Sequence, residues 1–257
     1  MPALDLAEAL RCAEAAADAA RREILPRFRA VAVETKRDGS PVTEADRAAE
    51  RALREVLRRF DPELAILGEE YGADGDTSRR GWIVDPIDGT IAFSRGLPLY
   101  GTLIALVDDG EPVLGLIDLP SLDERTCGHR GGGVRRNGVP VRCSRESDFS
   151  RALVSHGDPF AFELFGRKPA WTRLAAETRL LRGYTDAFGH AQVLNGSVSA
   201  MVDVNLNPWD AAATQALVPE AGGACAVIEP GPNGRGIGLV FGSPAIVERL
   251  LDLLRVG

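Results

Sequence analysis

Cysteine is scarce in this chain, and long apolar runs are missing. The four cysteines, Cys12, Cys127, Cys143 and Cys225, stand far apart and form no C-x-x-C pair. We therefore interpret them as buried thiols of a reducing compartment, since neither a disulfide framework nor a zinc site is indicated. No apolar run approaches the roughly 20 residues needed to span a bilayer, and residues 1–5 lack the segments of a signal peptide. We expect a cytoplasmic protein with no membrane partner.

The chain also has fewer basic than acidic residues. The formal net charge is −7 at pH 7, with 30 Lys and Arg against 37 Asp and Glu. A surface that binds nucleic acid is normally basic, so the composition argues against a nucleic-acid partner. The histidines, His129, His156 and His190, are scattered, and we expect surface or hydrogen-bonded side chains rather than metal ligands. The length of 257 residues allows one large domain or two small ones.

One stretch in the first half of the chain combines apolar residues with carboxylates. The run 82–84, Trp-Ile-Val, predicts the end of a buried strand. We expect this strand to stop at Asp85, because Pro86 has no N–H to donate to a neighbouring strand. Asp85 and Asp88 would then lie close together on a stiff turn. Two carboxylates placed in this way suit a hard cation.

Gly89 and Thr90 complete this stretch. A glycine here lets backbone amides approach a ligand closely, and such amides bind the oxyanions that a cation bridges. The alternative is a plain strand-to-turn junction in which Asp and Gly serve as turn formers. Two further stretches weigh against that alternative. They are 68–70 (Gly-Glu-Glu), just after the apolar run 64–67, and 208–213 (Pro-Trp-Asp-Ala-Ala-Ala) far downstream.

Together, the three stretches resemble the signatures of the inositol monophosphatase family, whose members are metal-dependent phosphomonoesterases. The similarity runs from about Lys36 to Gly223, with the stretches in the family's order. It implies an α+β layered fold, an α-β-α-β-α sandwich of the inositol monophosphatase and fructose-bisphosphatase type. It also implies a homodimer, a small phosphorylated substrate, and an active site where the two halves of the chain meet.

The pattern along the chain changes near residue 145. We expect an N-terminal α+β half, 1–145, with Glu69 and the 85–90 motif, and a C-terminal α/β half, 146–257, with Asp210 and the substrate-selectivity segment. In the first half we expect helices at 4–25 and 91–95, and another that begins after Thr43 as its N-cap. We expect strands at 64–68, 100–107 and 113–118, a mobile loop at 71–80 and a turn at Asn137-Gly138. In the second half we expect strands at 153–155, 179–181, 200–204, 224–228 and 237–241, alternating with helices at 171–177, 187–195, 210–219 and 245–254.

The resemblance implies a set of metal ligands. They are the carbonyl of Ile87 and the carboxylates of Glu69, Asp85, Asp88 and Asp210. Oxygen donors of this kind favour Mg²⁺, with Mn²⁺ possible, over zinc. Four ionised carboxylates carry −4, and Asp46 nearby makes −5, so the pocket would repel a phosphate dianion unless two or three divalent ions bind. Asp210 has an alternative role as N-cap of the helix that follows it.

The implied mechanism is a direct attack of water on the phosphate. Glu69 would bind metal and, with Thr90, orient and deprotonate the water, while Asp46 would line the same site. The amides of Gly89 and Thr90 would bind phosphate oxygens, and Lys36 would line the phosphate site as well. Two alternatives stay open: Asp46 as an acid that complements a helix dipole, and Lys36 as a solvated surface lysine.

Selectivity in this family rests on the segment 182–186 and on an acid ahead of the Trp-Asp motif, which here is Asp203. Arg182 followed by Asp186, and the segment 100–106, resemble the histidinol-phosphate phosphatase branch. An inositol-selective member would carry Glu in place of Asp203, and the histidinol branch usually carries Glu as well. The alternative for Arg182 and Asp186 is a structural ion pair.

Histidinol phosphate is therefore the predicted substrate, which would place the enzyme in histidine biosynthesis. Its amine and imidazole would meet Asp186 and Asp203 as acidic partners. Inositol 1-monophosphate, or a broad range of sugar and polyol phosphates, is the alternative. A 3′-phosphonucleotide phosphatase and a non-catalytic binding protein are less favoured, because no additional nucleotide-contacting residues are identifiable and no liganding carboxylate is missing.

Overall fold

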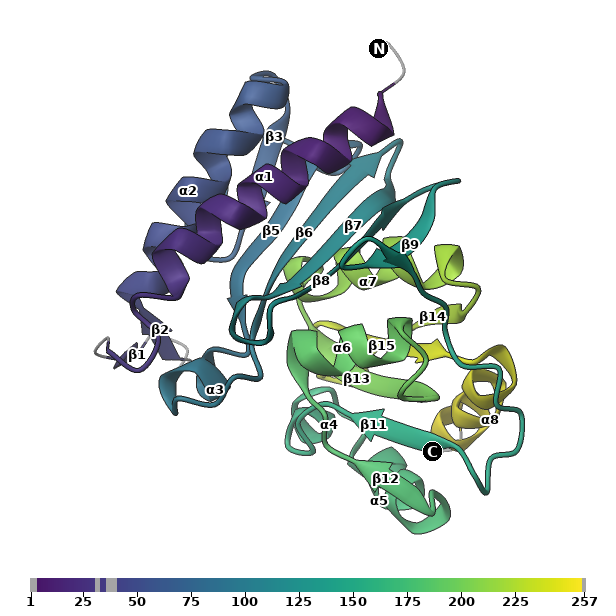
Figure 1. Cartoon of the computed structure of the whole chain (residues 1–257). Helices are drawn as coiled ribbons and strands as arrows, with labels where there is room; N and C mark the ends of the chain where they lie inside the picture. Colours follow the sequence, from purple (N-terminus) through teal and green to yellow (C-terminus); the bar gives the residue numbers. More distant parts are fainter. Residues whose placement is uncertain (1–3, 31–32, 36–40, 256–257) are drawn as a thin grey trace.

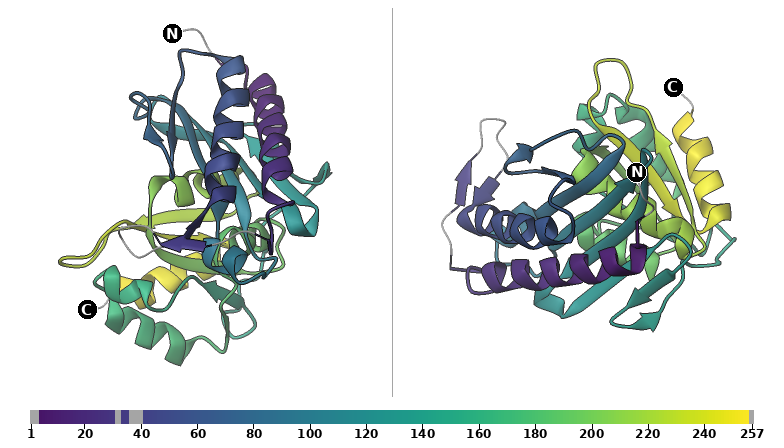
Figure 2. Two further views of the ribbon diagram at one scale, coloured as in Figure 1. Left: turned by 90° about the vertical axis from the view of Figure 1, so that its left-hand side faces the viewer. Right: turned by 90° about the horizontal axis from the view of Figure 1, so that it is seen from above.

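The computed structural model describes residues 4–30, 33–35 and 41–255. Within these ranges, layers of helix alternate with two sheets (Figure 1). Helices α1 (Leu6–Ile24) and α2 (Glu44–Phe60) lie side by side across one face of the larger sheet (Figures 1 and 2). Thr43 caps α2 through its side chain, as the sequence predicts. The short strands β1 (Val33–Thr35) and β2 (Pro41–Thr43) pair with each other near the start of α2.

The larger sheet occupies the middle of the first half of the chain. Its spatial order is β10-β9-β8-β7-β6-β5-β3-β4, with antiparallel neighbours except that β3 and β5 run parallel. Asn137 and Gly138, both with positive φ, form the expected turn between its last two strands. The strands are β3 (Ala65–Gly68), β4 (Gly72–Ala73), β5 (Arg80–Asp88), β6 (Gly101–Asp108), β7 (Glu111–Leu119), β8 (Glu124–His129), β9 (Gly133–Arg136) and β10 (Val139–Pro140).

The second sheet has the order β12-β11-β13-β15-β14. Its strands are β11 (Leu153–His156), β12 (Leu180–Arg182), β13 (Ala200–Leu206), β14 (Ala224–Ile228) and β15 (Ile237–Gly242). Strand β11 is parallel to β12 and β13, as strands alternating with helices predict. The alternation stops at the last two expected strands, where β14 turns directly back into β15 and both pairings of β15 are antiparallel.

The remaining helices complete the layers. Helices α6 (Asp186–Leu194) and α7 (Pro208–Glu220) lie between the sheets, since their buried residues pack against both. Helices α4 (Ala161–Leu164), α5 (Lys168–Glu177) and α8 (Pro244–Arg255) pack on the outer face of the second sheet. The short helices α3 (Thr90–Ser94) and η1 (Pro120–Leu122) connect strands of the first sheet. The described chain is therefore an α-β-α-β-α sandwich, which confirms the predicted fold class.

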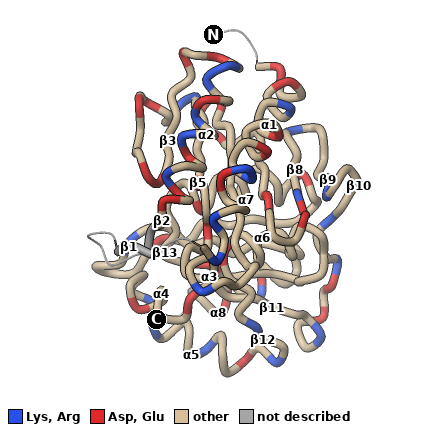
Figure 3. Tube along the Cα trace, turned by 60° about the vertical axis from the view of Figure 1, so that its left-hand side comes forward, with Lys and Arg blue, Asp and Glu red and all other residues tan. Residues whose placement is uncertain are grey.

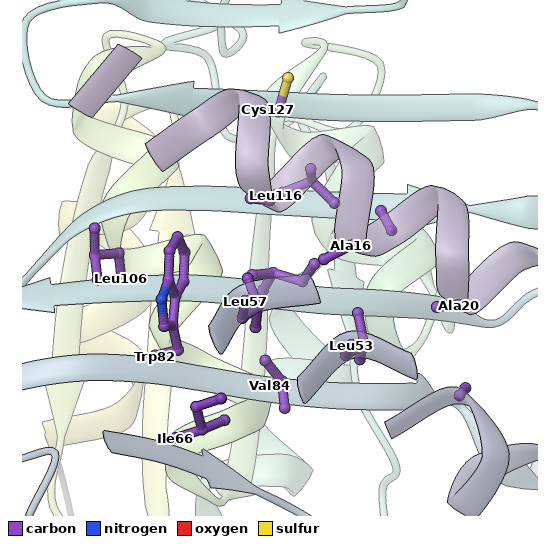
Figure 4. Packing of buried hydrophobic residues seen from close by; sticks show 14 of the residues in the cluster. Ala16, Ala20, Leu53, Leu57, Ile66, Trp82, Val84, Leu106, Leu116 and Cys127 are labelled. Carbon is purple, nitrogen blue, oxygen red and sulfur yellow. The ribbon is translucent and has the colours of Figure 1, made fainter. Parts of the chain in front are cut away.

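Side chains of the first sheet alternate between two cores, because successive residues of a strand point to opposite faces. Trp82 and Val84 of β5 pack with Ala16 of α1 and Leu57 of α2 (Figure 4). Ile83, which lies between them in sequence, belongs instead to the core shared with α6 and α7. A fully buried large apolar side chain contributes about 1.5–3 kcal/mol. This sheet is therefore held on both faces, which makes it a firm support for the polar residues at the end of β5.

Strand β5 does not end at Asp85, contrary to the expectation from Pro86. It continues to Asp88, and its register against β6 shifts between Asp85 and Asp88. This irregularity accommodates the proline, which cannot donate to the ladder. The carbonyl of Pro86 accepts a hydrogen bond from the Thr102 hydroxyl at 2.8 Å, and the Ile87 amide donates to Asp85 Oδ1 at 2.9 Å. The carboxylates thus extend from a bulged strand, not from a free turn.

Residues 71–80, expected to be a mobile loop, contain β4 and Asp74, whose side chain contacts neighbouring elements. Asp74 Oδ1 accepts a hydrogen bond from the Ile66 amide at 2.6 Å. Its other oxygen pairs with Arg54 and Arg58 of α2. The segment is therefore tied both to strand β3 and to the helix above it.

The chain passes from one sheet to the other between Pro140 and Leu153. This crossing includes the boundary between residues 145 and 146 that the sequence suggests. Helix α7 of the second half packs against strands β6 and β7 of the first, so the two halves share a core. The division into 1–145 and 146–257 stays a prediction. Among the described helices, none has the length and apolar character required to cross a membrane.

Candidate active site

A cavity of about 270 Å³ lies where segments from both sheets come together. The end of β5, the start of α6, strand β13 and the start of α7 line it, together with α4. Its described lining contains carboxylates and neither Lys nor Arg; the acidic residues are Glu69, Asp85, Asp88, Asp158, Asp186, Asp203 and Asp210. An anionic ligand would meet strong repulsion here unless cations entered with it.

Three of these carboxylates converge on one point. One oxygen each from Asp85, Asp88 and Asp210 lies within 4.8 Å of the other two. Asp85 is only 1% exposed. Glu69, which follows strand β3, and Ile87 line the same cavity. The structure thus brings together the residues that the sequence suggests as metal ligands, although they come from both halves of the chain.

Asp210 owes its orientation to the start of α7. Its Oδ2 accepts hydrogen bonds from the Asn207 amide at 2.7 Å and from Asn207 Nδ2 at 3.2 Å. The alternative role of Asp210 as N-cap is wrong, because Asn207 is the N-cap and Asp210 is the third helical residue of a reciprocal capping box. Pro208 at the first helical turn displaces the cap upstream, because proline is preorganised for that position.

The environment of these carboxylates disfavours their charged form. Burial, followed by the charges of Glu69 and Asp88, raises the pKa of Asp85 well above its usual value. Burial, followed by the charges of Asp186 and Asp210, does the same to the pKa of Asp88. Burial and nearby acids raise the pKa of Asp210 to about 7, against hydrogen bonds from Asn207 that lower it. Such mutual repulsion is relieved by a divalent cation, and the all-oxygen donor set fits a hard ion. The cluster can therefore bind a metal.

Asp46 lies beside this cluster at the first turn of α2. Its Oδ2 accepts hydrogen bonds from the amide and the hydroxyl of Thr43, both at 2.7 Å. Its Oδ1 is 3.5 Å from Thr90 Oγ1, which also lies 2.9 Å from the Ile87 carbonyl. Burial raises the pKa of Asp46, and the charge of Glu69 adds to this effect. The capping role of Asp46 and its proximity to the site therefore hold together.

Gly89 lies between strand β5 and helix α3, and it too lines the cavity. Its φ is 85°, a left-handed conformation that glycine adopts without strain. An added Cβ would lie 3.0 Å from the Leu99 carbonyl and 3.3 Å from Asp186 Oδ2. Glycine is needed here both for the turn and for the close approach of Asp186. Lys36 lies outside the described residues.

Asp186 lines the cavity, whereas Arg182 does not. Asp186 begins α6 with a φ of 55°, accepts a hydrogen bond from the Thr185 hydroxyl at 2.7 Å, and lines the cavity. Burial raises its pKa to about 6, the Asp203 charge adds to the rise, and His190 opposes it. Arg182 is exposed, donates to the Leu181 carbonyl, and is not among the described lining residues. No ion pair joins these two described residues, so that alternative is wrong.

Asp203 has a partner that sequence reasoning missed. His190 is 1% exposed; its Nε2 lies 3.1 Å from Asp203 Oδ2, and its Nδ1 lies 2.6 Å from Thr214 Oγ1. His190 also lines the cavity. It is hydrogen-bonded, as expected of the histidines, but its spacing of four residues from Asp186 on one helix already places both on the same face. Asp158 at the exposed rim was missed too, since Gly-Asp-Pro indicates only a turn.

Both the sequence and the fold are similar to those of known proteins. The sequence profile of the inositol monophosphatase family matches residues 5–249. The histidinol-phosphatase of Chlorobaculum parvum is 39% identical over 198 residues, 77% of this chain and 76% of that protein. The histidinol-phosphatase of Streptomyces coelicolor is 37% identical over 242 residues, 89% of this chain and 91% of that protein.

The fold comparison points to the same family. The structure of an inositol monophosphatase from Zymomonas mobilis superposes with a TM-score of 0.84 at 32% identity, covering 99% of this chain and 100% of that one. The family profile and the Zymomonas mobilis structure extend over nearly the whole chain, and so include both sheets and the residues around the acidic cavity. The chain belongs to the inositol monophosphatase family and is a phosphoric monoester hydrolase.

Proposed function

We propose that this protein is a Mg²⁺-dependent histidinol-phosphatase that acts by direct attack of water on the phosphate. The observation that carries the proposal is the division of one acidic cavity into two groups of carboxylates. Asp85, Asp88 and Asp210 converge within 4.8 Å, whereas Asp186 and Asp203 line the cavity with hydrogen-bonding partners of their own. The first group suits metal ions, and the second suits the non-phosphate end of a cationic substrate.

The metal ligands in this proposal are Asp85, Asp88 and Asp210, with Glu69 and the carbonyl of Ile87. Two or three Mg²⁺ ions would balance the negative charge of the cavity and polarise the phosphate and the attacking water. The carboxylates contribute the binding energy, because each is partly or fully buried among other acids and is stabilised when a cation arrives.

The protein's own groups would handle the proton of the attacking water. Glu69 would accept that proton as general base. The Thr90 hydroxyl can donate to Asp46 Oδ1 or to the Ile87 carbonyl, but its single hydrogen serves one of them at a time. Donation to either group uses only the hydrogen, so both lone pairs of the Thr90 oxygen are free to accept a hydrogen bond from the water. The amides of Gly89 and Thr90 would bind phosphate oxygens, and Lys36 would support them.

The substrate assignment rests on charge. Histidinol phosphate carries an amine and an imidazole, which are cations or hydrogen-bond donors. Asp186 and Asp203 would accept from these groups, and each charge-assisted contact is worth about 1.5–3 kcal/mol. The histidinol-phosphatases named above are similar over most of the chain. Arg182 is not proposed as a contact, because it is exposed and outside the cavity lining.

Two assays test the proposal. Hydrolysis of histidinol phosphate should need Mg²⁺ and should stop when a chelator is added. The ratio kcat/KM should be higher for histidinol phosphate than for inositol 1-monophosphate. Activity that a chelator leaves unchanged would remove the metal mechanism, and a preference for inositol phosphate would remove the substrate assignment alone.

Inositol 1-monophosphate is the second candidate substrate. Its hydroxyls can donate to the carboxylates of Asp186 and Asp203, and the structure of the Zymomonas mobilis inositol monophosphatase covers 99% of this chain. A homodimer in the cytoplasm stays a prediction for either substrate. Light scattering at micromolar concentration measures the assembly directly, and a mass of one chain, 27.4 kDa, would contradict it.

A further inference from the structure

We propose that Glu50, in the middle of α2, is a positioning residue that aims the Glu69 carboxylate into the cavity. Glu50 is fully buried, with 0% of its surface exposed. Its Oε2 accepts a hydrogen bond from the Glu70 amide at 2.7 Å, and its Oε1 accepts from the Tyr71 amide at 3.3 Å. The inference rests on the proposed role of Glu69.

The Glu70 amide is the important contact. It belongs to the planar peptide that begins at the carbonyl carbon of Glu69. Holding this amide fixes the plane of that peptide, and so restricts the backbone rotation of Glu69 and the direction of its side chain. The turn between β3 and β4 is short, since Gly68 pairs with Gly72. One buried carboxylate that binds two successive amides can therefore determine the shape of the whole turn.

Arg54 completes this arrangement from the next turn of α2. Its Nε donates to Glu50 Oε1 at 2.8 Å, and its other nitrogens donate to the Ile66 and Gly72 carbonyls. Arg54 thus binds a residue of β3 and a residue of β4, on either side of the Glu69 turn. A buried ion pair is by itself weak evidence for stability, because desolvation offsets much of its attraction. The number of directed contacts to one turn points instead to orientation.

The packing around Gly68 indicates how closely Glu50 approaches. A Cβ added to Gly68 would lie 2.1 Å from Glu50 Oε1, so any side chain there must displace the carboxylate. Glu50 and Asp46 lie four residues apart on α2, on one face of the helix. Acidic and basic residues both occur along this helix (Figure 3). The same face of α2 thus places Asp46 near Thr90 and Glu50 under the Glu69 turn.

The test compares Glu50→Gln with a matched buried carboxylate elsewhere. Glutamine carries no charge to balance Arg54, and its single oxygen cannot occupy both positions at which Glu50 accepts the two backbone amides. We therefore expect kcat to fall about 10- to 100-fold, and Mg²⁺ affinity, measured by isothermal titration calorimetry, to fall about tenfold. KM for the substrate should change little. The control is Asp118→Asn on β7, since Asp118 is also 0% exposed and pairs with Arg21 and Arg125. The control should lower the melting temperature without changing kcat or Mg²⁺ affinity.

A double-mutant cycle separates this inference from the proposed function. Adding Glu50→Gln to Glu69→Gln should cost little further activity, because the group that Glu50 aims is already lost. If the losses of activity from Glu50→Gln and Glu69→Gln multiply in the double variant, the positioning role is overturned. It is also overturned if Asp118→Asn lowers kcat and Mg²⁺ affinity as much as Glu50→Gln does. If Glu69→Gln itself keeps full activity, the role of Glu69 in the proposed function fails instead. If Glu50→Gln does not fold, Glu50→Asp can replace it. The shorter side chain keeps the charge but moves the carboxylate away from the Glu70 and Tyr71 amides, and it is compared with Asp118→Asn and combined with Glu69→Gln in the same way.

Discussion

The two groups of acids in the cavity have different neighbours. Asp85, Asp88 and Asp210 face one another, and burial together with neighbouring acids raises the pKa of each. Asp186 and Asp203 each have a hydrogen-bonding partner within the protein, Thr185 and His190. The first group needs a cation from outside to relieve its charge. Asp186 and Asp203 lie outside this convergent set, and each contacts a side-chain donor of the protein, which is why we separate metal binding from substrate recognition within one cavity.

The largest loss of activity is expected when a carboxylate of the first group, the proposed metal ligands, is changed. Asp88→Asn removes a charge at the centre of the cluster, so activity should fall on the order of 10³-fold or more. Steady-state kinetics at ordinary and raised Mg²⁺ measure the loss. The matched control is Asp109→Asn, because that carboxylate is 83% exposed and pairs only with Arg79 in the described chain. Near-normal activity of Asp88→Asn at ordinary Mg²⁺ would show that the metal group is misassigned.

A smaller effect, confined to substrate choice, is expected for the other group. Asp186→Asn keeps the size and shape of the side chain but removes its negative charge. The ratio kcat/KM for histidinol phosphate should fall about 10- to 100-fold, and that for inositol phosphate should fall less, since hydroxyls carry no charge. Competition between the two substrates measures the preference directly. An unchanged ratio would leave the substrate assignment standing but not the role of Asp186.

The partner of Asp203 provides a sharper comparison. In His190→Leu, the buried carboxylate loses its Nε2 contact, and KM should rise about tenfold with a smaller change in kcat. In His190→Gln, the side-chain amide can replace the Nε2 donor, so KM should stay closer to that of the native enzyme. Melting curves of both variants check the fold. Equal KM values for the two variants would mean that His190 serves packing and not Asp203.

The smallest effect concerns stability without metal. Since the folded state disfavours the charged form of Asp88, a neutral amide should relieve repulsion at neutral pH. In the presence of a chelator, Asp88→Asn should melt about 2–4 °C above the native protein. Added Mg²⁺ should raise the melting temperature of the native protein more than that of the variant. A lower melting temperature in the chelated variant would contradict the repulsion described above.

Local patterns in the sequence predicted many elements well. The short strand before Glu69, the hairpin of β6 and β7, the Thr43 cap and the Asn137-Gly138 turn all follow from periodicity and turn chemistry. The expectation failed at Pro86, where the ladder accepts a proline at a register shift, because pairing with β6 outweighs a local rule. Helix α4 was missed as well, since it is short and rests on packing against the second sheet.

By itself, the sequence determined the kinds of donor and their local spacing. Asp85 and Asp88 are near each other because few covalent bonds separate them, and their oxygens favour hard cations whatever the fold. Only the tertiary structure decided that Asp210 completes the same cluster and that His190 binds Asp203. The physical reason is that α6 and α7 are buried between the two sheets, so contacts between distant residues depend on how those layers pack.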